Sequence, residues 1–248
     1  MTITGWNEVR PAAFDRACEP SAALAALDVA EWRDLYAAAR RFVAGREWYT
    51  AEGWQPDDDE FAELQWRIAA EATLMVLKLD AALFDDVATI ILYPSGFMAT
   101  GSYTDEDGIE HRISEPRSGE AWEQGPVVLA ADDVLDPPPG TSLVIHEFAH
   151  KLDALNGRMN GFPPMPAHMS PARWSDVFQH AWDRLDALDD AGAALPVDDY
   201  ALENPAEFFA VMCESFFIEP LNLRRSLPEV YALLSEWFSQ DPAARVEA

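Results

Sequence analysis

Apolar residues recur at helical spacing in two segments of the N-terminal third. One segment is residues 29–43, and the other is residues 61–79, where the pattern repeats at Phe61, Leu64, Ile68, Leu74 and Leu77. Both patterns predict amphipathic helices. Residues 53–56 mark a loop between them, and the acids at 57–60 favour a helix start because a helix N-terminus carries partial positive charge.

The middle of the chain has a different pattern, with short runs rich in β-forming residues at 87–93, 97–103, 109–113 and 126–130. Turn-forming residues separate these runs at 94–96, 105–108 and 118–125. The sequence therefore predicts a small mixed or antiparallel sheet over residues 87–131, and we expect it to be largely antiparallel.

Helical signals return after the proline-rich residues 137–140. Thr141 or Ser142 is the candidate N-cap of an apolar helix that runs to Leu155 and ends at Asn156-Gly157. Further helices are predicted at 171–188, from Asn204-Pro205 to about residue 218, and at 228–238. This order predicts a mostly helical α+β fold in which residues 1–248 form a single domain, with helices at 20–80 and 141–240 around the sheet.

The composition is that of a globular protein. Hydrophobic residues make up 49% of the chain, with 9 Trp and 13 Phe, which is too many for a disordered protein. The apolar runs are too short to span a bilayer, and the N-terminal residues lack the basic and apolar segments of a secretory signal, so we expect a cytoplasmic protein. Cys18 and Cys213 form no CxxC pair, and each is expected to be a small buried or half-buried side chain.

The charge is strongly negative, with 44 Asp and Glu against 17 Lys and Arg and a net charge of −27. Such a field repels phosphate backbones and anionic lipids, so nucleic acids and membranes are poor candidate partners. Cations and basic peptides are better ones. The alternative is that the excess charge only keeps the surface solvated.

One motif in the predicted helix 141–155 carries chemistry: residues 146–150 read His-Glu-Phe-Ala-His. Residues four apart on a helix lie about 40° apart in azimuth and about 6 Å apart along the axis, so His146 and His150 can bind one zinc ion. Glu147 lies beside them and can act as general base toward a water that the metal activates. Without a metal, an apolar helix would bury these three residues with no obvious partners.

A catalytic zinc needs a third protein ligand, and several residues are candidates. The pattern HExxHxxGxxH is excluded, because the chain has Asp153 and Asn156 where that pattern needs Gly and His. His111, His168 and His180 can coordinate in principle, but a glutamate of the helix that begins at Asn204 is the better option. That helix offers Glu207 and Glu214.

Glu207 and Glu214 share a helix face because seven residues make about two turns, so one can bind the metal while the other orients a ligand. Their spacing alone does not rank them. Glu207 also has a purely structural interpretation, in which Asn204 is the N-cap, Pro205 occupies the first helical position and Glu207 closes a capping box.

Three stretches together resemble the Mlc titration factor A (MtfA) family of zinc peptidases. They are residues 146–163 with the motif, residues 200–217 with the segment Asn-Pro-Ala-Glu-Phe-Phe-Ala, and residues 117–129 with Arg-Ser-Gly-Glu-Ala-Trp. The resemblance runs from about residue 93 to residue 238. It implies a gluzincin-type, zincin-like domain whose active site is similar to that of the anthrax lethal factor catalytic domain.

The same resemblance implies that Glu207 is the third ligand and that Tyr200 is a catalytic tyrosine. Glu214 and Asp153 are then the candidates for residues that support the ligands. The resemblance further implies weak aminopeptidase-like activity and, in one member, binding to a glucose-responsive transcriptional repressor. Two departures from the family pattern, Asn160 in place of Asp and Ala130-Ala131 in place of Ser-Trp, concern substrate preference and not the zinc.

We therefore expect one Zn²⁺ per chain and hydrolysis of a peptide or protein substrate, with Glu147 as base and Tyr200 as a donor to the developing oxyanion. Residues 126–130 are the candidate sheet edge for binding an extended peptide, with an ordinary inner strand as the alternative. A zinc-stabilised protein that titrates a regulator by binding is the rival hypothesis, and a hydrolase of non-peptide amides is a third.

Overall fold

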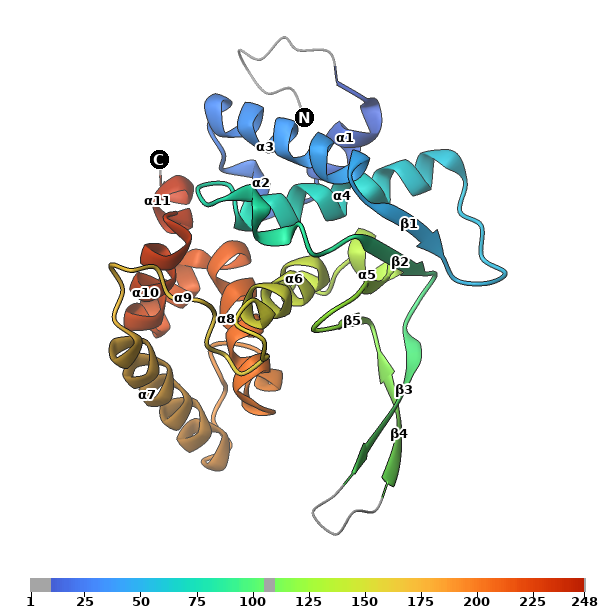
Figure 1. Ribbon diagram of the computed structural model, residues 1–248. Helices are drawn as coiled ribbons and strands as arrows, with labels where there is room; N and C mark the ends of the chain where they lie inside the picture. The colour runs from blue at the N-terminus through green and yellow to red at the C-terminus, as the bar shows by residue number, and fades with distance from the viewer. Residues whose placement is uncertain (1–9, 105–109, 248) are drawn as a thin grey trace.

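The computed structural model describes residues 10–104 and 110–247 and is mostly helical, with two small sheets (Figure 1). Its helices, including the 3₁₀ turns η1 and η2, are α1 Ala12–Cys18, α2 Ala22–Ala25, α3 Val29–Ala44, α4 Asp58–Met75, η1 Ala81–Phe84, α5 Ala131–Leu135, α6 Leu143–Ala154, α7 Pro171–Asp190, η2 Asp199–Leu202, α8 Pro205–Ile218, α9 Pro220–Ser226, α10 Pro228–Phe238 and α11 Pro242–Glu247. Its strands are β1 Glu47–Thr50, β2 Thr89–Tyr93, β3 Phe97–Thr104, β4 Glu110–Arg117, β5 Gly119–Ala121 and β6 Val127–Ala130.

The six longer helices fall where the sequence predicts them. α3 begins at the capping box of Asp28, and α4 begins after Asp57, whose carboxylate accepts the Glu60 N–H. α6 begins after Ser142, which settles the choice of N-cap between Thr141 and Ser142. Shorter helices such as α5 and α9 were not predicted, because segments of five to seven residues carry too few apolar positions to show a period.

The main sheet has four strands in the order β1-β2-β6-β5. β1, β2 and β6 are parallel, and only β5 is antiparallel to its neighbour β6. The expectation of a largely antiparallel sheet is therefore wrong for this sheet, whereas the α+β class and the alternative of a small mixed sheet are confirmed. The first parallel pair arises because α4 connects β1 to β2 as a crossover, and the short β1 and β5 carried no recognisable strand pattern.

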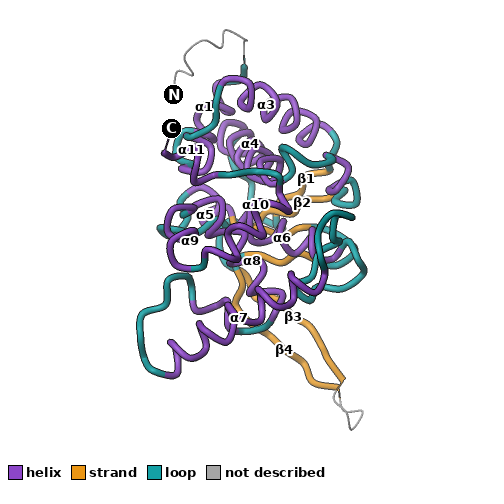
Figure 2. Tube along the Cα trace, turned by 90° about the vertical axis from the view of Figure 1, so that its left-hand side faces the viewer, coloured by secondary structure: helices purple, strands orange, loops and turns teal. Residues whose placement is uncertain are grey.

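β3 and β4 form a separate antiparallel hairpin, in which Phe97 pairs with Arg117. Figures 1 and 2 both show it projecting away from the helices. The predicted strand 109–113 is part of β4, except that residue 109 lies outside the described residues. The chain passes from β4 almost directly into β5, so the hairpin begins and ends beside the main sheet.

Helix α6 lies at the centre of the fold, where it packs against α4, α8 and the strands β5 and β6. Its Phe148 is fully buried, with ring centroids 5.6 Å from Phe42 and 4.9 Å from Phe84. Burying such a ring stabilises the fold by roughly 1.5–3 kcal/mol. This packing fixes α6 between the N-terminal helices, at the top of Figure 1, and the C-terminal helices, at its left.

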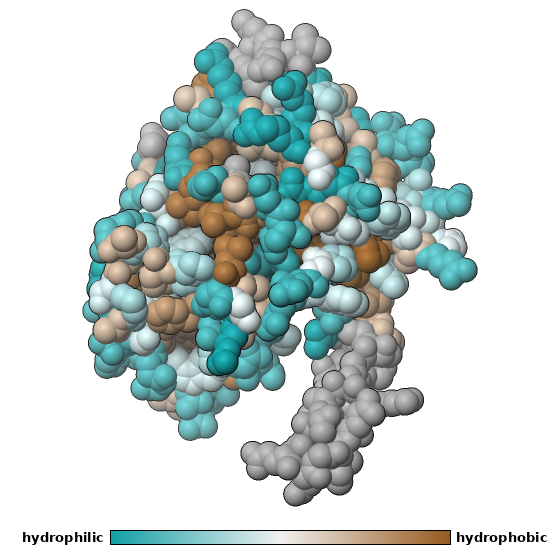
Figure 3. Space-filling view, in the orientation of Figure 1, coloured by the Kyte–Doolittle hydropathy of each residue, from teal (hydrophilic) through white to brown (hydrophobic). Residues whose placement is uncertain are grey.

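The visible face of the molecule is mostly hydrophilic. Hydrophilic residues cover much of the face in Figure 3, and hydrophobic residues gather in a patch to the left of its centre. Cys18 and Cys213 are buried free thiols, as predicted. Within residues 10–104 and 110–247, every helix is too short or too polar to cross a lipid bilayer.

Candidate metal centre

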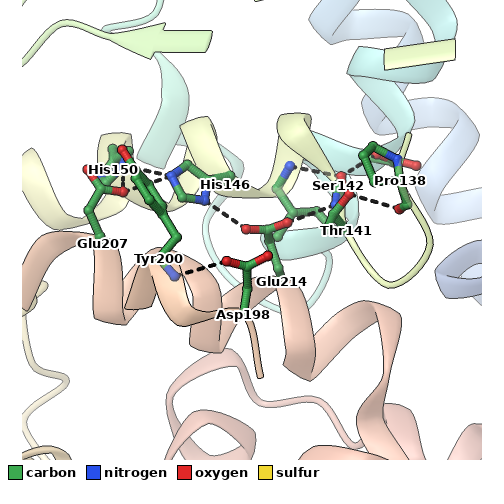
Figure 4. A network of polar contacts seen from close by, with 11 residues as sticks. Pro138, Thr141, Ser142, His146, His150, Asp198, Tyr200, Glu207 and Glu214 are labelled. Carbon is green, nitrogen blue, oxygen red and sulfur yellow. Dashed lines mark hydrogen bonds and ion pairs between the residues drawn. The ribbon is translucent and has the colours of Figure 1, made fainter. Parts of the chain in front are cut away.

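The centre is built on α6 and α8, which pack against each other (Figure 4). Ser142 caps α6 by accepting the Ile145 N–H through its Oγ at 3.1 Å. His146, Glu147 and His150 then follow in the body of the helix. Phe148, on the opposite face, holds the helix in the core, so the two histidines face α8.

The start of α8 presents Glu207 to these histidines. Asn204 is the N-cap, and its Oδ1 accepts the N–H groups of Ala206 at 2.9 Å and Glu207 at 3.1 Å, while Pro205 occupies the first helical position. The Glu207 carboxylate does not complete a capping box; its Oε2 lies 2.9 Å from His146 Nε2 and 3.2 Å from His150 Nε2. The structure therefore contradicts the alternative in which the Glu207 carboxylate closes a capping box.

The candidate ligand atoms, His146 Nε2, His150 Nε2 and Glu207 Oε2, form a nearly equilateral triangle. Its third side, between the two Nε2 atoms, is 3.2 Å long. Ligand atoms around a tetrahedral zinc ion, with bonds of about 2.0–2.1 Å, lie about 3.3 Å from one another. His146, His150 and Glu207 are the group of metal-binding type found among the described residues. The donor set and the spacing both fit zinc, with the fourth position left for a water or a substrate.

Glu214 contacts the other nitrogen of His146, with Oε1 at 2.7 Å from Nδ1. If Nδ1–H donates to Glu214, the neutral ring presents a lone pair at Nε2. A lone pair facing the Glu207 carboxylate at 2.9 Å is repulsive unless a proton or a metal cation lies between them. The geometry therefore calls for a positive charge at the centre of the triangle.

In the metal-free site a proton supplies that charge. Burial disfavours the charged ring of His146, but hydrogen bonds to Glu207 and Glu214 outweigh this effect and raise the pKa of His146 well above 6.5. Burial also disfavours the charged carboxylate of Glu207, yet the two histidines lower the pKa of Glu207 to about 2. Both shifts have the same cause, the contact between the imidazoles and the carboxylates, and both favour a positive charge at this position.

Glu147 lies on the cleft side of α6 and is 5% exposed. Burial raises the pKa of Glu147, and the nearby His146 and His150 oppose that rise. The carboxylate rests directly against the backbone of Gly119 in β5: a Cβ atom at that position would lie 2.2 Å from Glu147 Oε1. Glycine at 119 thus makes room for the candidate base.

Tyr200 lies in η2, which begins when Asp198 accepts the Tyr200 N–H at 2.9 Å. The ring is 49% exposed, and its centroid lies 5.9 Å from that of His146. Figure 4 shows the side chain pointing from η2 toward the two histidines and Glu207. Burial, followed by the charge of Glu207, raises the pKa of Tyr200, so the phenol keeps its proton at neutral pH.

The other residues that the sequence singled out lie apart from the triangle. Asp153 is buried, and its carboxylate accepts the N–H groups of Gly161 at 2.7 Å and Phe162 at 2.8 Å, which holds the loop after α6. His168 and His180 are exposed. His111 lies in β4, and its side chain is outside the described part of the structure.

A cleft of 1090 Å³ opens over the triangle, lined by residues of β5, α6, η2 and α8. The strand along this cleft is β5, whereas β6 is buried and paired on both sides, with β2 and β5. The prediction that residues 126–130 form the sheet edge is therefore wrong, and the alternative of an inner strand is correct. The edge is residues 119–121, inside a segment that the sequence predicted as a loop.

Sequence reasoning also missed Lys151, which is fully buried although it is one of only two lysines. Its Nζ donates to the carbonyls of Trp122 at 3.0 Å and Glu123 at 3.3 Å and pairs with Asp86 at 3.1 Å. The lysine thus ties α6 to the turn after β5. Its position next to His150 was the only signal in the sequence, and it does not reveal these partners.

The chain was compared with known proteins. The family model described as glucose-regulated metallo-peptidase M90 matches residues 4–239. The Mlc titration factor A proteins of Yersinia pestis (strain Pestoides F) and Yersinia pseudotuberculosis serotype O:1b (strain IP 31758) are each 40% identical over 189 residues, covering 74% of this chain and 70% of the relative. The chain therefore belongs to the family of glucose-regulated metallo-peptidases M90, together with the Mlc titration factor A proteins.

Proposed function

We propose that the chain is a zinc-dependent peptidase that hydrolyses peptide bonds. The observation that carries this proposal is the convergence of His146 Nε2, His150 Nε2 and Glu207 Oε2 beside the buried Glu147 at the floor of an open cleft. A purely structural zinc site is closed by a fourth protein ligand and has no need of a base. This arrangement has three ligands and a base.

When bound, a zinc ion supplies Lewis-acid polarisation of the substrate carbonyl and lowers the pKa of a water. Glu147 then takes the proton of the attacking water and delivers it to the leaving amine. The raised pKa of Glu147 suits this double role, because the group must release the proton as readily as it accepts it. Glu214 holds His146 in the tautomer that leaves Nε2 free for the metal.

Tyr200 is the proposed donor to the oxyanion that develops on the attacked carbonyl. Its phenol keeps its proton, and the half-exposed ring lies at the mouth of the site with room for a substrate. On the opposite side of the cleft, β5 offers an unpaired strand edge of the main sheet for an extended peptide.

The substrate proposal follows the family resemblance, which implies aminopeptidase-like activity. The described cleft lining carries the rim acids Glu120, Glu123, Asp133, Asp198 and Asp199, with Arg117 as its cationic member. Such a lining favours a free α-amino group or a basic side chain over an acidic one. We propose a cytoplasmic protein in which residues 1–248 form one domain, since the buried hydrophobic residues from Ala13 to Ala243 form a single cluster.

A second candidate function comes from the name of the Yersinia relatives, Mlc titration factor A, which describes a factor that titrates Mlc. A related role for this chain is binding of a transcriptional regulator protein, with the metal serving stability. The presence of Glu147 beside the metal ligands favours catalysis over this rival.

The deciding experiment is turnover of a peptide library by zinc-loaded protein, with Glu147→Gln as the matched control. The parent should cleave and Glu147→Gln should not, while both hold about one zinc per chain. Equal cleavage by both proteins would remove the proposed mechanism. A parent that binds zinc and a regulator but cleaves nothing would establish the rival function.

A further inference from the structure

A buried chain of polar side chains leads from the metal centre to the N-terminal helices. The second oxygen of Glu214, Oε2, accepts the backbone N–H of Ser142 at 2.8 Å. The Ser142 hydroxyl donates to Glu71 Oε2 on α4 at 2.7 Å. Glu71 Oε1 forms an ion pair with Arg67 Nε at 2.8 Å, and Arg67 Nη1 donates to the Ala17 carbonyl of α1 at 2.7 Å.

The side chains of this polar network are all buried. Arg67, Glu71 and Ser142 are 3–4% exposed, and Glu214 is 8% exposed. A buried ion pair is a weak source of stability, because removing both charges from water costs about as much as their attraction returns. The pair Arg67–Glu71 also lies outside the machinery proposed for catalysis, so its place in the core requires another explanation.

Ser142 connects this network of polar side chains to both helices of the metal centre, α6 and α8. Its hydroxyl accepts the Ile145 N–H and donates to Glu71, which fixes the start of α6 relative to α4. Its backbone N–H fixes one oxygen of Glu214, so the other oxygen has a defined position at His146 Nδ1. The orientation of the His146 ring thus depends on contacts that begin at Glu71.

His150 provides a comparison within the same site. Its Nδ1 is buried and has no hydrogen-bond partner among the described residues, so packing orients this ring. Among the described residues, the network of Glu214, Ser142 and Glu71 thus reaches His146 and not Nδ1 of His150.

From these contacts we infer that Arg67 and Glu71 are positioning residues for the metal centre, acting through Ser142 and Glu214 on His146. Arg67 pairs with Oε1 of Glu71, and Oε2 of Glu71 accepts the Ser142 hydroxyl. Through Arg67 and Glu71, the N-terminal helices α1 and α4 then contribute to the zinc affinity of the site. This inference rests on the metal site of the proposed function.

The test measures the zinc dissociation constant of purified full-length variants by competition with a chromophoric chelator, and the unfolding temperature of each metal-free protein. Glu71→Gln should weaken zinc binding by about 10-fold, the lower end of the range usual for direct partners of a ligand, because Glu71 acts through Ser142 and Glu214. The matched control is Glu31→Gln, which removes the same charge from the ion pair between Glu31 of α3 and Arg245 of α11, 2.7 Å long and 13% exposed on both sides. The control should keep the parent's dissociation constant within about 2-fold.

Ser142 variants test the connection itself and decide the matter if Glu71→Gln fails to fold. Ser142→Thr keeps the hydroxyl and should keep the parent's affinity, whereas Ser142→Ala should lose about as much as Glu71→Gln. Adding Glu71→Gln to Ser142→Ala should then cost little more, because the chain is already interrupted.

Three results would overturn the inference: parental zinc affinity in folded Glu71→Gln, equal affinities in Ser142→Ala and Ser142→Thr, or the same loss of affinity in Glu31→Gln. A parent that binds no zinc would instead refute the proposed function. The two failures are therefore distinguishable.

Discussion

Gly119 is the residue whose replacement tests the geometry of the base most directly. In Gly119→Ala the new Cβ would lie 2.2 Å from Oε1, 2.7 Å from Cδ and 2.8 Å from Cγ of Glu147. Ordinary contacts begin near 3.4 Å, so one partner must move by about 1 Å. The alanine lies on a strand paired with β6, and Glu147 is a side chain with free torsions, so the base moves.

A displacement of about 1 Å in a catalytic group costs on the order of 10²-fold in rate, or about 2.7 kcal/mol of transition-state stabilisation. We therefore expect Gly119→Ala to lower kcat by about 10²-fold while zinc content and unfolding temperature stay near those of the parent. The assay is steady-state hydrolysis of the best peptide from the library, together with metal analysis.

Two variants make this result specific. Gly96→Ala is the control, because its Cβ would meet ordinary contacts, 3.4 Å from the Arg117 carbonyl oxygen and 3.9 Å from Ser118 Oγ. Glu147→Asp shortens the acid by one methylene group, so in the Gly119→Ala background it should cost less than it does in the parent. Full activity in Gly119→Ala, or an equal cost of Glu147→Asp in both backgrounds, would refute the steric argument.

Three further predictions follow from the contacts of the site. Glu207→Ala should weaken zinc binding more than Glu214→Ala, which should cost about 10–100-fold, and the reverse ranking by chelator competition would exchange their roles. Zinc affinity should fall about tenfold per unit as the pH drops below the raised pKa of His146, since the ring is protonated there and must release its proton to bind; a flat profile from about pH 6 to 8 would contradict this. Tyr200→Phe should keep zinc but lower kcat by about 10²-fold, and parental turnover at saturating substrate would leave the ring a packing role.

The motif helix could be predicted from the sequence because its signals are local. Ser142, the apolar residues and the terminal Gly157 all lie within one helix length of the histidines, and Gly157 does adopt a left-handed conformation with φ 92°. The same holds for the start of α8 at Asn204-Pro205. Each element depends on residues that are neighbours in the chain.

The sheet edge could not be predicted in this way, because strand pairing joins distant segments. β5 has only three residues, Gly119–Ala121, and no strand pattern of its own. Its role follows from pairing with β6 and from the contact of Gly119 with Glu147, 28 residues later in the chain. A longer, more apolar run such as β6 is the better strand by sequence and, for that reason, the inner one.

Glu207 and Glu214 show why equal spacing left two ligands unranked. Seven residues separate them by about 10.5 Å along α8, so both face α6. The structure places the His146 ring between them, with Nε2 toward Glu207 and Nδ1 toward Glu214. Only Glu207 also reaches His150. Which glutamate is the candidate ligand thus depends on the position of the His146 ring, which belongs to α6. The sequence of α8 alone does not give that position.

The same arrangement explains why a chain with net charge −27 can bury so many acids around one helix. Glu147, Glu207, Glu214 and Glu71 all lie within reach of α6 and are largely buried, so their mutual repulsion needs positive charge nearby. Arg67 forms an ion pair with Glu71. In the metal-free site, the raised pKa values of His146 and Glu147 favour bound protons, which reduce the repulsion among the other carboxylates. A divalent cation held by His146, His150 and Glu207 would take the place of the His146 proton and supply a fixed positive charge there. Occupancy of the metal site should for this reason stabilise the whole fold and not the cleft alone.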